Sequence, residues 1–245
     1  MIENIAAYHF VPIDDVERLV GQLRGRAEAG ALLGSVLVAE EGINLFLAGA
    51  PAAIDTFLDA LCADPRFAPI LVKRSRSATQ PFARLKVKRR REIISFRRIG
   101  VSPLEGRAPA LEPARLARWI QQGCDEQGRR LVLLDTRNRE EVAHGTFEGA
   151  MTLPITRFGE FADAASARRD DLTDATVVSF CTGGIRCEKA ALWMQANGFD
   201  NVWQLDGGIL GYFEQVGSFG YSGRCFVFDE RVALDSGLAP LVDAP

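Results

Sequence analysis

Histidine and cysteine are scarce in this sequence, and their spacing does not fit a metal site. The 245 residues include only two His and five Cys. No two cysteines are separated by just two residues, which argues against a zinc ribbon, and their odd number argues against a disulfide framework. We therefore expect no metal site and a free thiol at every cysteine. These are Cys62, Cys124, Cys181, Cys187 and Cys225.

Long apolar runs and nucleotide-binding motifs are also absent. Apolar runs span only a handful of residues, whereas a membrane helix needs about 18. The opening residues, MIENIAAYHF, include an acidic residue and lack the apolar core of a secretory signal. Neither a G-x-G-x-x-G nor a Walker motif occurs. The sequence predicts a cytoplasmic protein without a membrane partner and without an identifiable cofactor.

The composition is that of a folded protein. Hydrophobic residues make up 47% of the chain and charged residues 25%, which excludes a disordered chain. A length of 245 residues fits one large domain or two small ones.

Positive charge is concentrated in one segment. Residues 73–98 contain eleven Lys or Arg and a single acid, whereas the rest of the chain has 18 basic and 31 acidic residues. Such a patch suits a polyanion, although charge also protects an exposed edge strand from aggregation. Only Phe82 and Phe96 interrupt the patch, which predicts a surface that follows phosphates rather than one that stacks bases. The candidate RNA-binding residues are Lys73, Arg74, Arg84, Lys86, Lys88, Arg89, Arg90 and Arg91.

The first 99 residues have the pattern of a ferredoxin-like domain. Apolar periodicity predicts strands and helices in the order β-α-β-β-α-β. The expected strands cover 6–11, 35–39, 43–48 and 70–74, and the expected helices cover 14–29 and 51–63. Two further extended segments, 82–88 and 92–98, are expected within the basic run.

A linker rich in Gly and Pro is expected at 100–112, followed by a second domain at 113–220 and a short C-terminal extension at 221–245. The second domain alternates buried-type strands with helices, as in a doubly wound parallel sheet. The fold class is therefore α+β followed by α/β. In parallel sheets of this kind the site lies at the carboxyl ends of the strands.

Cys181 follows an apolar strand and precedes a glycine-bearing loop and a helix. The loop is Thr182, Gly183, Gly184 and Ile185, and the helix is expected to begin at Arg186. Backbone N–H groups of such a loop and of a helix N-terminus form an anion cradle, and the two glycines permit the positive φ that lets several N–H groups point inward. A thiol placed there ionises readily and serves as a nucleophile. The alternative is an ordinary buried cysteine beside a turn.

Three further residues are possible auxiliaries of this loop. Cys187 lies six positions after Cys181 and is a candidate to resolve an oxidised or persulfidated Cys181, although a packing role in the first helical turn is the alternative. Asp135 and Arg137 end a neighbouring strand and are expected to hold the loop or to pair with each other.

The segment CTGGIRCEKA resembles the active loop of rhodanese domains. The preceding segment DTRNREEVAHGTFEGAMTLP and the following GFDNVWQLDGGILGY resemble the flanking elements of those domains. The resemblance covers about 112–215 and implies a rhodanese fold.

The whole chain resembles the rhodanese-domain tRNA uridine hydroxylases. The segments LVAEEGINLFLAG, PFARLKVKRRREIISF and GRCFVFDERV are similar to hallmarks of that family. The resemblance implies an acylphosphatase-like first domain and oxygen-dependent conversion of uridine 34 of tRNA to 5-hydroxyuridine. It also implies a cysteine, here Cys181, that is needed for activity, with molecular oxygen as co-substrate and tRNA rather than DNA as the partner.

Two other functions remain open from the residues alone. A rhodanese-type sulfurtransferase would carry a persulfide on Cys181, and the loop chemistry by itself favours this interpretation. A rhodanese-fold binding module without activity is the other alternative. The retention of Cys181 and Arg186 argues against it.

Overall fold

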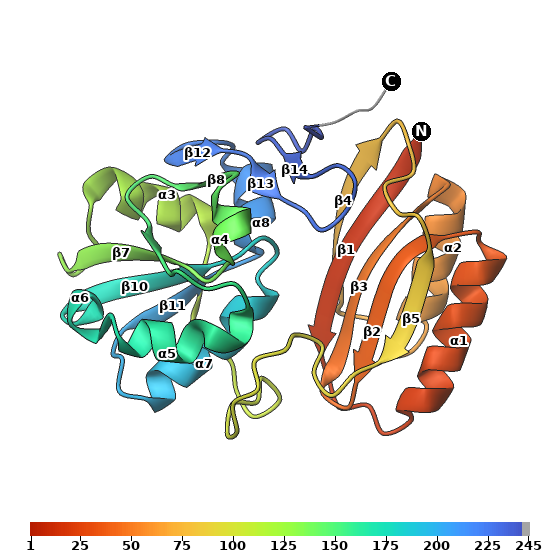
Figure 1. Cartoon of the computed structure of the whole chain (residues 1–245), viewed down its shortest axis with the longest axis horizontal. Coiled ribbons are helices and arrows are strands. Elements are labelled where there is room, and N and C mark those ends of the chain that lie inside the picture. The colour runs from red at the N-terminus through yellow and green to blue at the C-terminus, as the bar shows by residue number, and fades with distance from the viewer. Residues whose placement is uncertain (242–245) are drawn as a thin grey trace. The chain divides into compact units, whose positions relative to one another are not determined.

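The computed structural model describes residues 1–241, which form two compact units (Figure 1). The first unit contains Met1–Ser95 and Phe228–Val232, and the second contains Phe96–Val227 and Ala233–Leu238. Each unit has its own cluster of buried apolar side chains. No helix within residues 1–241 combines the length and apolar character that a membrane crossing requires.

The first unit is a five-stranded sheet with two helices, and the predicted ferredoxin-like fold is confirmed. Its strands lie in the order β4-β1-β3-β2-β5. The added strand β5 pairs in parallel with β2, while the other neighbours are antiparallel. The elements are β1 (Ile2–Phe10), α1 (Val16–Ala29), β2 (Leu33–Ala39), β3 (Gly42–Gly49), α2 (Pro51–Cys62), β4 (Leu71–Ser77) and β5 (Leu85–Arg89).

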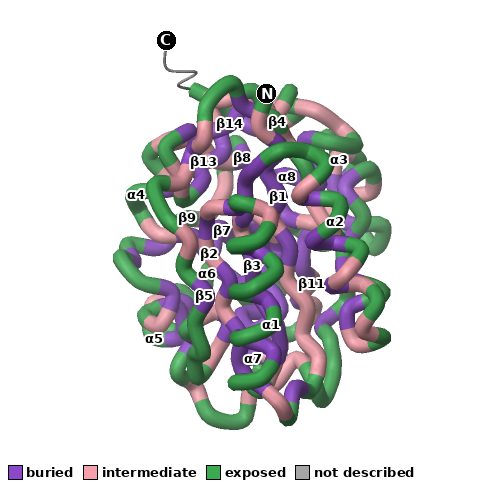
Figure 2. The backbone as a smooth tube through the Cα atoms, turned by 90° about the vertical axis from the view of Figure 1, so that its right-hand side faces the viewer, coloured by how far each residue is buried: buried purple, intermediate pink, exposed green. Residues whose placement is uncertain are grey.

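Helices α1 and α2 cover one face of this sheet (Figure 1). In α1, the apolar residues Val16, Leu19 and Leu23 recur at helical spacing and are buried, whereas the residues between them are mostly exposed (Figure 2). They pack in one cluster with Ile5 and Val36 of the sheet. Burying four or five such side chains against a sheet, at about 1.5–3 kcal/mol each, fixes the helix in place.

The predicted extended segment 92–98 does not form a strand, and that prediction is wrong. Its backbone groups bind side chains instead of a neighbouring strand. The Ile93 N–H donates to the Glu41 carboxylate at 2.8 Å, and the Asn44 amide donates to the Ile93 carbonyl at 3.1 Å. Both backbone polar groups of Ile93 are therefore hydrogen-bonded without a neighbouring strand, because Glu41 and Asn44 of the β2–β3 hairpin provide the partners.

The second unit contains a five-stranded parallel sheet of order β6-β11-β10-β7-β9, and the predicted rhodanese-type α/β fold is confirmed. Two two-stranded sheets accompany it. The elements are β6 (Ala110–Leu111), α3 (Pro113–Gln122), β7 (Arg130–Asp135), α4 (Arg139–Val142), β8 (Gly145–Phe147), β9 (Met151–Thr152), α5 (Phe161–Ser166), α6 (Arg169–Leu172), β10 (Ala175–Phe180), α7 (Ile185–Ala196), β11 (Val202–Leu205), α8 (Gly208–Gln215), β12 (Tyr221–Gly223), β13 (Cys225–Phe226) and β14 (Ala233–Leu234).

The central strand β10 positions the site. All six of its residues are buried, because it has a neighbour on each side and its two faces are covered. Its carboxyl end leads directly into Cys181, and helix α7 begins four residues later at Ile185. The chain therefore places the cysteine between a strand end and a helix start, as the sequence predicts.

The boundaries around the second unit differ from the predicted ones. Ala110–Leu111 lies within the expected linker 100–112 but pairs with β11. Tyr221–Gly223 lies within the expected extension 221–245 but pairs with β8. Phe228–Val232, also in that extension, belongs to the first unit, where Arg231 donates to the Ser75 hydroxyl at 2.7 Å. Residues 242–245 of the extension lie outside the described residues.

Candidate active site

The sulfur of Cys181 lies in a cradle of backbone N–H groups. The Gly184 N–H donates to the Cys181 Sγ at 3.1 Å, and the Arg186 backbone N–H faces the same sulfur. Gly184 is the N-cap of α7 and has φ 101°, a conformation that favours glycine. Gly183 does not have positive φ. A single residue in the left-handed conformation, Gly184, is enough to connect the loop to helix α7.

The Cys181 thiol is strongly acidified although it is completely buried. Burial raises its pKa, but three other effects outweigh it. The Cys187 thiol donates a hydrogen bond, the Arg186 guanidinium supplies positive charge, and the Arg186 and Gly184 N–H groups bind the sulfur. Together they lower the pKa of Cys181 to about 6, which leaves a thiolate at neutral pH.

Cys187 is the partner of that thiolate and stays protonated itself. Burial, its hydrogen bond to Cys181 and the charge of the Cys181 thiolate raise the pKa of Cys187 well above the ordinary value. Its sulfur lies 3.9 Å from the Thr136 hydroxyl. The two sulfurs therefore act as a donor–acceptor pair, with the proton on Cys187.

Arg186 is held by a buried carboxylate. Its two terminal nitrogens donate to the two Glu141 carboxylate oxygens, each at 2.6 Å. Both side chains are almost completely buried, and Glu141 also accepts the Asn138 N–H at 3.1 Å. Although burial lowers it, this pair with Glu141 raises the pKa of Arg186. The bidentate pair fixes the guanidinium near Cys181.

Asp135 and Arg137 pair with each other. The Arg137 Nε and Nη2 atoms donate to the two Asp135 oxygens at 2.9 and 2.7 Å, and neither side chain is exposed. Arg137 also donates to the Gly145 carbonyl at 2.6 Å, and Thr146 donates to Asp135 at 2.7 Å. The pair thus connects the end of β7 to β8. The two charges therefore neutralise each other in the interior.

The N-terminus of helix α8 packs against the Cys181 loop. The Ile209 N–H donates to the Cys181 carbonyl at 2.9 Å, and the Leu210 N–H donates to the Thr182 carbonyl at 3.0 Å. Gly208 has φ 62°, and an added Cβ there would lie 2.5 Å from the Cys181 carbonyl oxygen. A side chain at position 208 would therefore collide with the backbone of the loop. The close packing of α8 against the loop requires glycine at this position.

Cys225 lies beside this loop in the structure, a position that the sequence does not predict. The thiol of Cys225 is buried and bonds with Thr182, whose hydroxyl lies 3.4 Å from the Phe226 carbonyl. Burial raises the pKa of Cys225 to about 12, so it remains neutral. The one sequence feature that points to Cys225 is the similarity of GRCFVFDERV to a hallmark of the hydroxylase family. Strand β13 has only two residues, too few to show an alternating apolar pattern. Among residues 1–241, no three His, Cys, Asp or Glu side chains gather as metal ligands would.

The candidate RNA-binding residues all lie in the first unit. Lys73 and Arg74 are on β4, and Lys86, Lys88 and Arg89 are on β5. Arg84 precedes β5, and Arg90 and Arg91 follow it. Strands β4 and β5 form the two edges of the sheet, so the basic run occupies both edges rather than one continuous ridge.

Comparison with known proteins assigns both units. A family model described as UPF0176 acylphosphatase like domain matches residues 2–93, and the Rhodanese-like domain model matches residues 113–215. The chain is 66% identical over 243 residues to a tRNA uridine(34) hydroxylase of Xanthomonas campestris pv. campestris (strain 8004), with 99% of this chain and 96% of that protein covered. The chain belongs to the tRNA uridine(34) hydroxylase family.

A second member of this family, from Xylella fastidiosa (strain 9a5c), is 63% identical over 243 residues, with 99% of this chain and 95% of that protein covered. Among solved structures, a rhodanese-like domain from Anabaena sp is 21% identical with a TM-score of 0.38, covering 47% of this chain and 79% of that one. The acylphosphatase from Bacillus subtilis is 18% identical with a TM-score of 0.30, covering 36% of this chain and 99% of that one.

Proposed function

We propose that this member of the family hydroxylates C5 of uridine 34 in tRNA, with Cys181 as the nucleophile and dioxygen as co-substrate, in the cytoplasm. The observation that carries the assignment of Cys181 is its thiolate, held at a pKa of about 6 by backbone N–H groups, the Cys187 thiol and Arg186. Such a group is a competent nucleophile at neutral pH.

The chemistry begins at C6 of the uracil ring. The Cys181 thiolate forms a bond to C6, and the electron pair of the C5–C6 double bond moves towards C5 and the C4 carbonyl. C5 then bonds to one atom of dioxygen. Protonation gives a hydroperoxide at C5. Two molecules of a thiol reductant then reduce it, so that the O–O bond breaks, the outer oxygen leaves as water, a hydroxyl remains on C5 and one disulfide forms. Loss of the C5 proton then expels the Cys181 thiolate from C6 and restores the C5–C6 double bond. Overall, uridine, dioxygen and two molecules of a thiol reductant give 5-hydroxyuridine, water and one disulfide.

The surrounding residues have positioning roles in this proposal. The Gly184 and Arg186 N–H groups and the Cys187 thiol stabilise the thiolate before attack and after release. Glu141 acts through Arg186, since it holds that guanidinium at both nitrogens. Asp135 and Arg137 support β7 and β8 beside the loop.

A sulfurtransferase is the second candidate, because the same cradle would stabilise a Cys181 persulfide. The deciding assay gives the purified protein unmodified tRNA and a thiol reductant under air or under nitrogen, and a separate assay supplies thiosulfate plus cyanide. We expect 5-hydroxyuridine under air, none under nitrogen, and little thiocyanate. Rapid thiocyanate formation with unchanged tRNA would overturn the hydroxylase. The matched control is Cys62→Ser, which removes a thiol from α2 in the other unit.

A further inference from the structure

Two thiols share one buried position at the start of α7. Neither the Cys181 nor the Cys187 side chain is exposed to solvent, and the Cys187 thiol donates a hydrogen bond to the Cys181 sulfur. The Cys187 N–H donates to the Gly184 carbonyl at 3.0 Å, and the Gly184 N–H donates to the Cys181 sulfur at 3.1 Å. The first turn of the helix therefore holds the two sulfurs in contact.

The other cysteines are placed differently. Cys225 is buried beside the same loop, but its thiol bonds with Thr182. Cys124 is half-buried after α3, and Cys62 is half-buried at the end of α2 in the other unit. Among residues 1–241, Cys187 is the thiol that bonds to Cys181.

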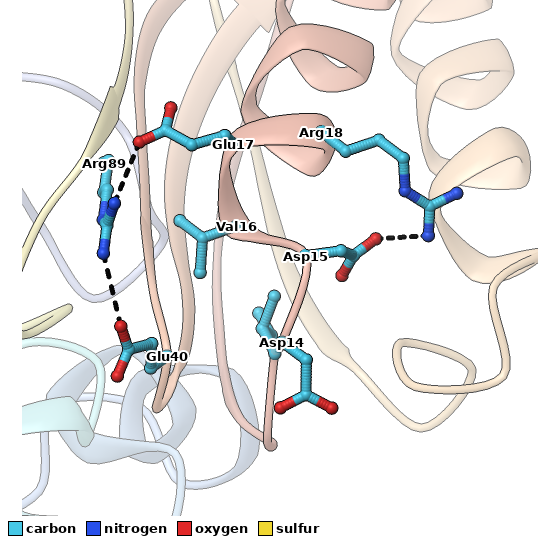
Figure 3. A pocket seen from close by; sticks show the side chains of 8 residues that line it. Asp14, Asp15, Val16, Glu17, Arg18, Glu40 and Arg89 are labelled. Carbon is cyan, nitrogen blue, oxygen red and sulfur yellow. Dashed lines mark hydrogen bonds and ion pairs between the residues drawn. The ribbon is translucent and has the colours of Figure 1, made fainter.

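The charged pocket of the first unit carries no comparable redox group. It lies at the start of α1, where Arg89 donates to Glu17 at 3.1 Å and to Glu40 at 3.3 Å (Figure 3). None of the residues that line it is a cysteine or a histidine. Its charges pair with each other, so this pocket supplies no group that reduces a substrate.

The proposed hydroxylation requires two thiols close to the Cys181 sulfur. Attack on C6 joins the uracil ring to that sulfur, so the hydroperoxide that forms on C5 is held next to it. Reduction of the hydroperoxide takes two electrons and two protons, which two thiols supply by forming a disulfide. Burial shields this position from thiols in solution, whereas Cys187 already contacts the Cys181 sulfur.

The bond to C6 also changes the state of Cys187. Burial, the hydrogen bond to Cys181 and the charge of the Cys181 thiolate raise the pKa of Cys187, whereas the Thr136 hydroxyl and the Arg186 charge lower it. A Cys181 sulfur bonded to carbon no longer carries a negative charge. The pKa of Cys187 therefore falls at the step that needs a reactive thiol.

We propose that Cys187 is the immediate reductant of the C5 hydroperoxide and that each turnover leaves a disulfide between Cys181 and Cys187. The Cys187 sulfur bonds to the outer oxygen, the O–O bond breaks, and the thiol proton goes to the oxygen that stays on C5. Loss of the C5 proton then expels the Cys181 thiolate from C6. This thiolate attacks the Cys187 sulfenic acid, and the hydroxide released takes up the C5 proton to give water.

The external thiol then acts on the protein disulfide rather than on the hydroperoxide itself. Two molecules of it reduce the Cys181–Cys187 disulfide and become one disulfide, so the overall balance of the proposed reaction is unchanged. The inference rests on the proposed function and adds which thiols the hydroperoxide oxidises first.

The first test is a single turnover of the full-length protein without external thiol. The protein is reduced, freed of reductant under nitrogen, and then given tRNA and air. We expect about one equivalent of 5-hydroxyuridine per chain and a Cys181–Cys187 disulfide. Trypsin cleaves after Arg186, so this disulfide joins two separate peptides that mass spectrometry identifies.

A parallel sample without tRNA should stay reduced, because oxygen alone does not supply the hydroperoxide. Equal disulfide formation with and without tRNA would overturn the proposal. A turnover disulfide that joins Cys181 to Cys225 would overturn it as well.

The second test compares Cys187→Ser with Cys124→Ser, the matched removal of a thiol from the same unit. Without external thiol, Cys187→Ser should give less than about a tenth of the wild-type product, because a thiol in contact is lost. Cys124→Ser should give the wild-type yield. With external thiol, the Cys187→Ser rate should rise in proportion to thiol concentration, whereas the wild-type rate should saturate. Equal single-turnover yields in the two variants would overturn the proposal.

A further measurement separates loss of the reductant from damage to the nucleophile. Serine keeps a donor beside Cys181, so the pH dependence of Cys181 alkylation by iodoacetamide should match that of the wild type. Thermal melting checks the fold of each variant. Loss of product together with loss of Cys181 alkylation would mean that Cys187 only positions the nucleophile, which overturns the reductant role.

Failure of this inference is distinguishable from failure of the proposed function. If wild type and Cys187→Ser make 5-hydroxyuridine equally well at every thiol concentration, the hydroxylase stands and Cys187 is not the reductant. If the wild type forms no 5-hydroxyuridine even with excess thiol under air, the proposed reaction itself fails, and this inference fails with it.

Discussion

The charged residues around the Cys181 loop and those of strand β5 are used in opposite ways. Around the loop, Arg137 and Arg186 are buried, and each is held at two points by one carboxylate. On β5, the side chains of Lys86 and Lys88 are exposed to solvent. A buried bidentate arginine has one geometry, whereas an exposed lysine follows whatever anion arrives. The first arrangement suits a fixed chemical site and the second suits a large, flexible ligand.

The same contrast applies to the cost of substitution. Removing one partner of a buried ion pair leaves an uncompensated charge in the interior, whereas an exposed pair exchanges its partner for water. The loop should therefore respond to single substitutions with large losses of stability or activity. Substitution of the exposed lysines should change the free energy of unfolding by no more than about 0.5 kcal/mol.

The largest effect is expected for Cys181→Ala. It removes the proposed nucleophile, so formation of 5-hydroxyuridine should fall by at least about a thousandfold, while the fold is kept. Mass spectrometry of nucleosides from treated tRNA measures the product. Cys181→Ser is the isosteric companion, and full activity in that variant would mean that the nucleophile is another residue.

Glu141→Gln tests the buried pair. It leaves the Arg186 charge without its partner in the interior, which should cost about 3–5 kcal/mol and lower the melting temperature by roughly 6–20 °C. The matched control is Asp163→Asn, which breaks the exposed 2.7 Å pair between Asp163 and Arg98. That control should melt within about 2 °C of the wild type. Similar shifts in both variants would contradict the contrast between buried and exposed charges.

The loop glycines provide a second matched pair. Gly184→Ala places a Cβ on a residue with φ 101° and displaces the N–H that binds Cys181, so we expect about a tenfold loss of activity. Gly183→Ala meets no atom within 4 Å, and its activity should stay near the wild-type rate. Steady-state rates of tRNA hydroxylation measure both. A larger loss in Gly183→Ala would show that the Gly184 N–H is not the critical donor.

The smallest effect concerns pH. Because the thiolate is the reactive form, the rate should rise as pH increases through the Cys181 pKa of about 6 and level off above pH 7. Cys187→Ala removes a hydrogen bond that lowers this pKa, so its inflection should move to higher pH. Cys187→Ser retains a donor and should keep the inflection near pH 6. The pH–rate profiles decide, and an unmoved inflection in Cys187→Ala would rule out the donor role.

The sequence best predicts those helices and strands whose ends are marked by Pro or Gly. Pro113 at the first turn and Gly123 at φ 71° bound α3 as the sequence indicates, because each residue type suits that backbone position. The strand–cysteine–glycine–helix order around Cys181 is equally local. Segment 92–98 fails because its backbone partners, Glu41 and Asn44, lie about fifty residues away, and periodicity carries no information about them.

The parts of the site that the sequence could not predict depend on pairing between distant segments. Strand β5, which carries Lys86 and Lys88, joins the sheet only by pairing with β2, and one sequence does not reveal that register. Cys225 reaches the loop because β13 and β14 pair and Thr182 bonds nearby. Both are long-range contacts between short or weakly patterned elements.

The complete burial of Cys181 also governs how long the enzyme survives. A thiolate reacts readily with peroxides, and a second oxidation to the sulfinic acid is irreversible for most proteins. Because the Cys181 side chain has no solvent contact, the surrounding residues shield the thiolate from a peroxide in solution. The burial of Cys181 therefore protects the enzyme's lifetime as well as shaping its chemistry.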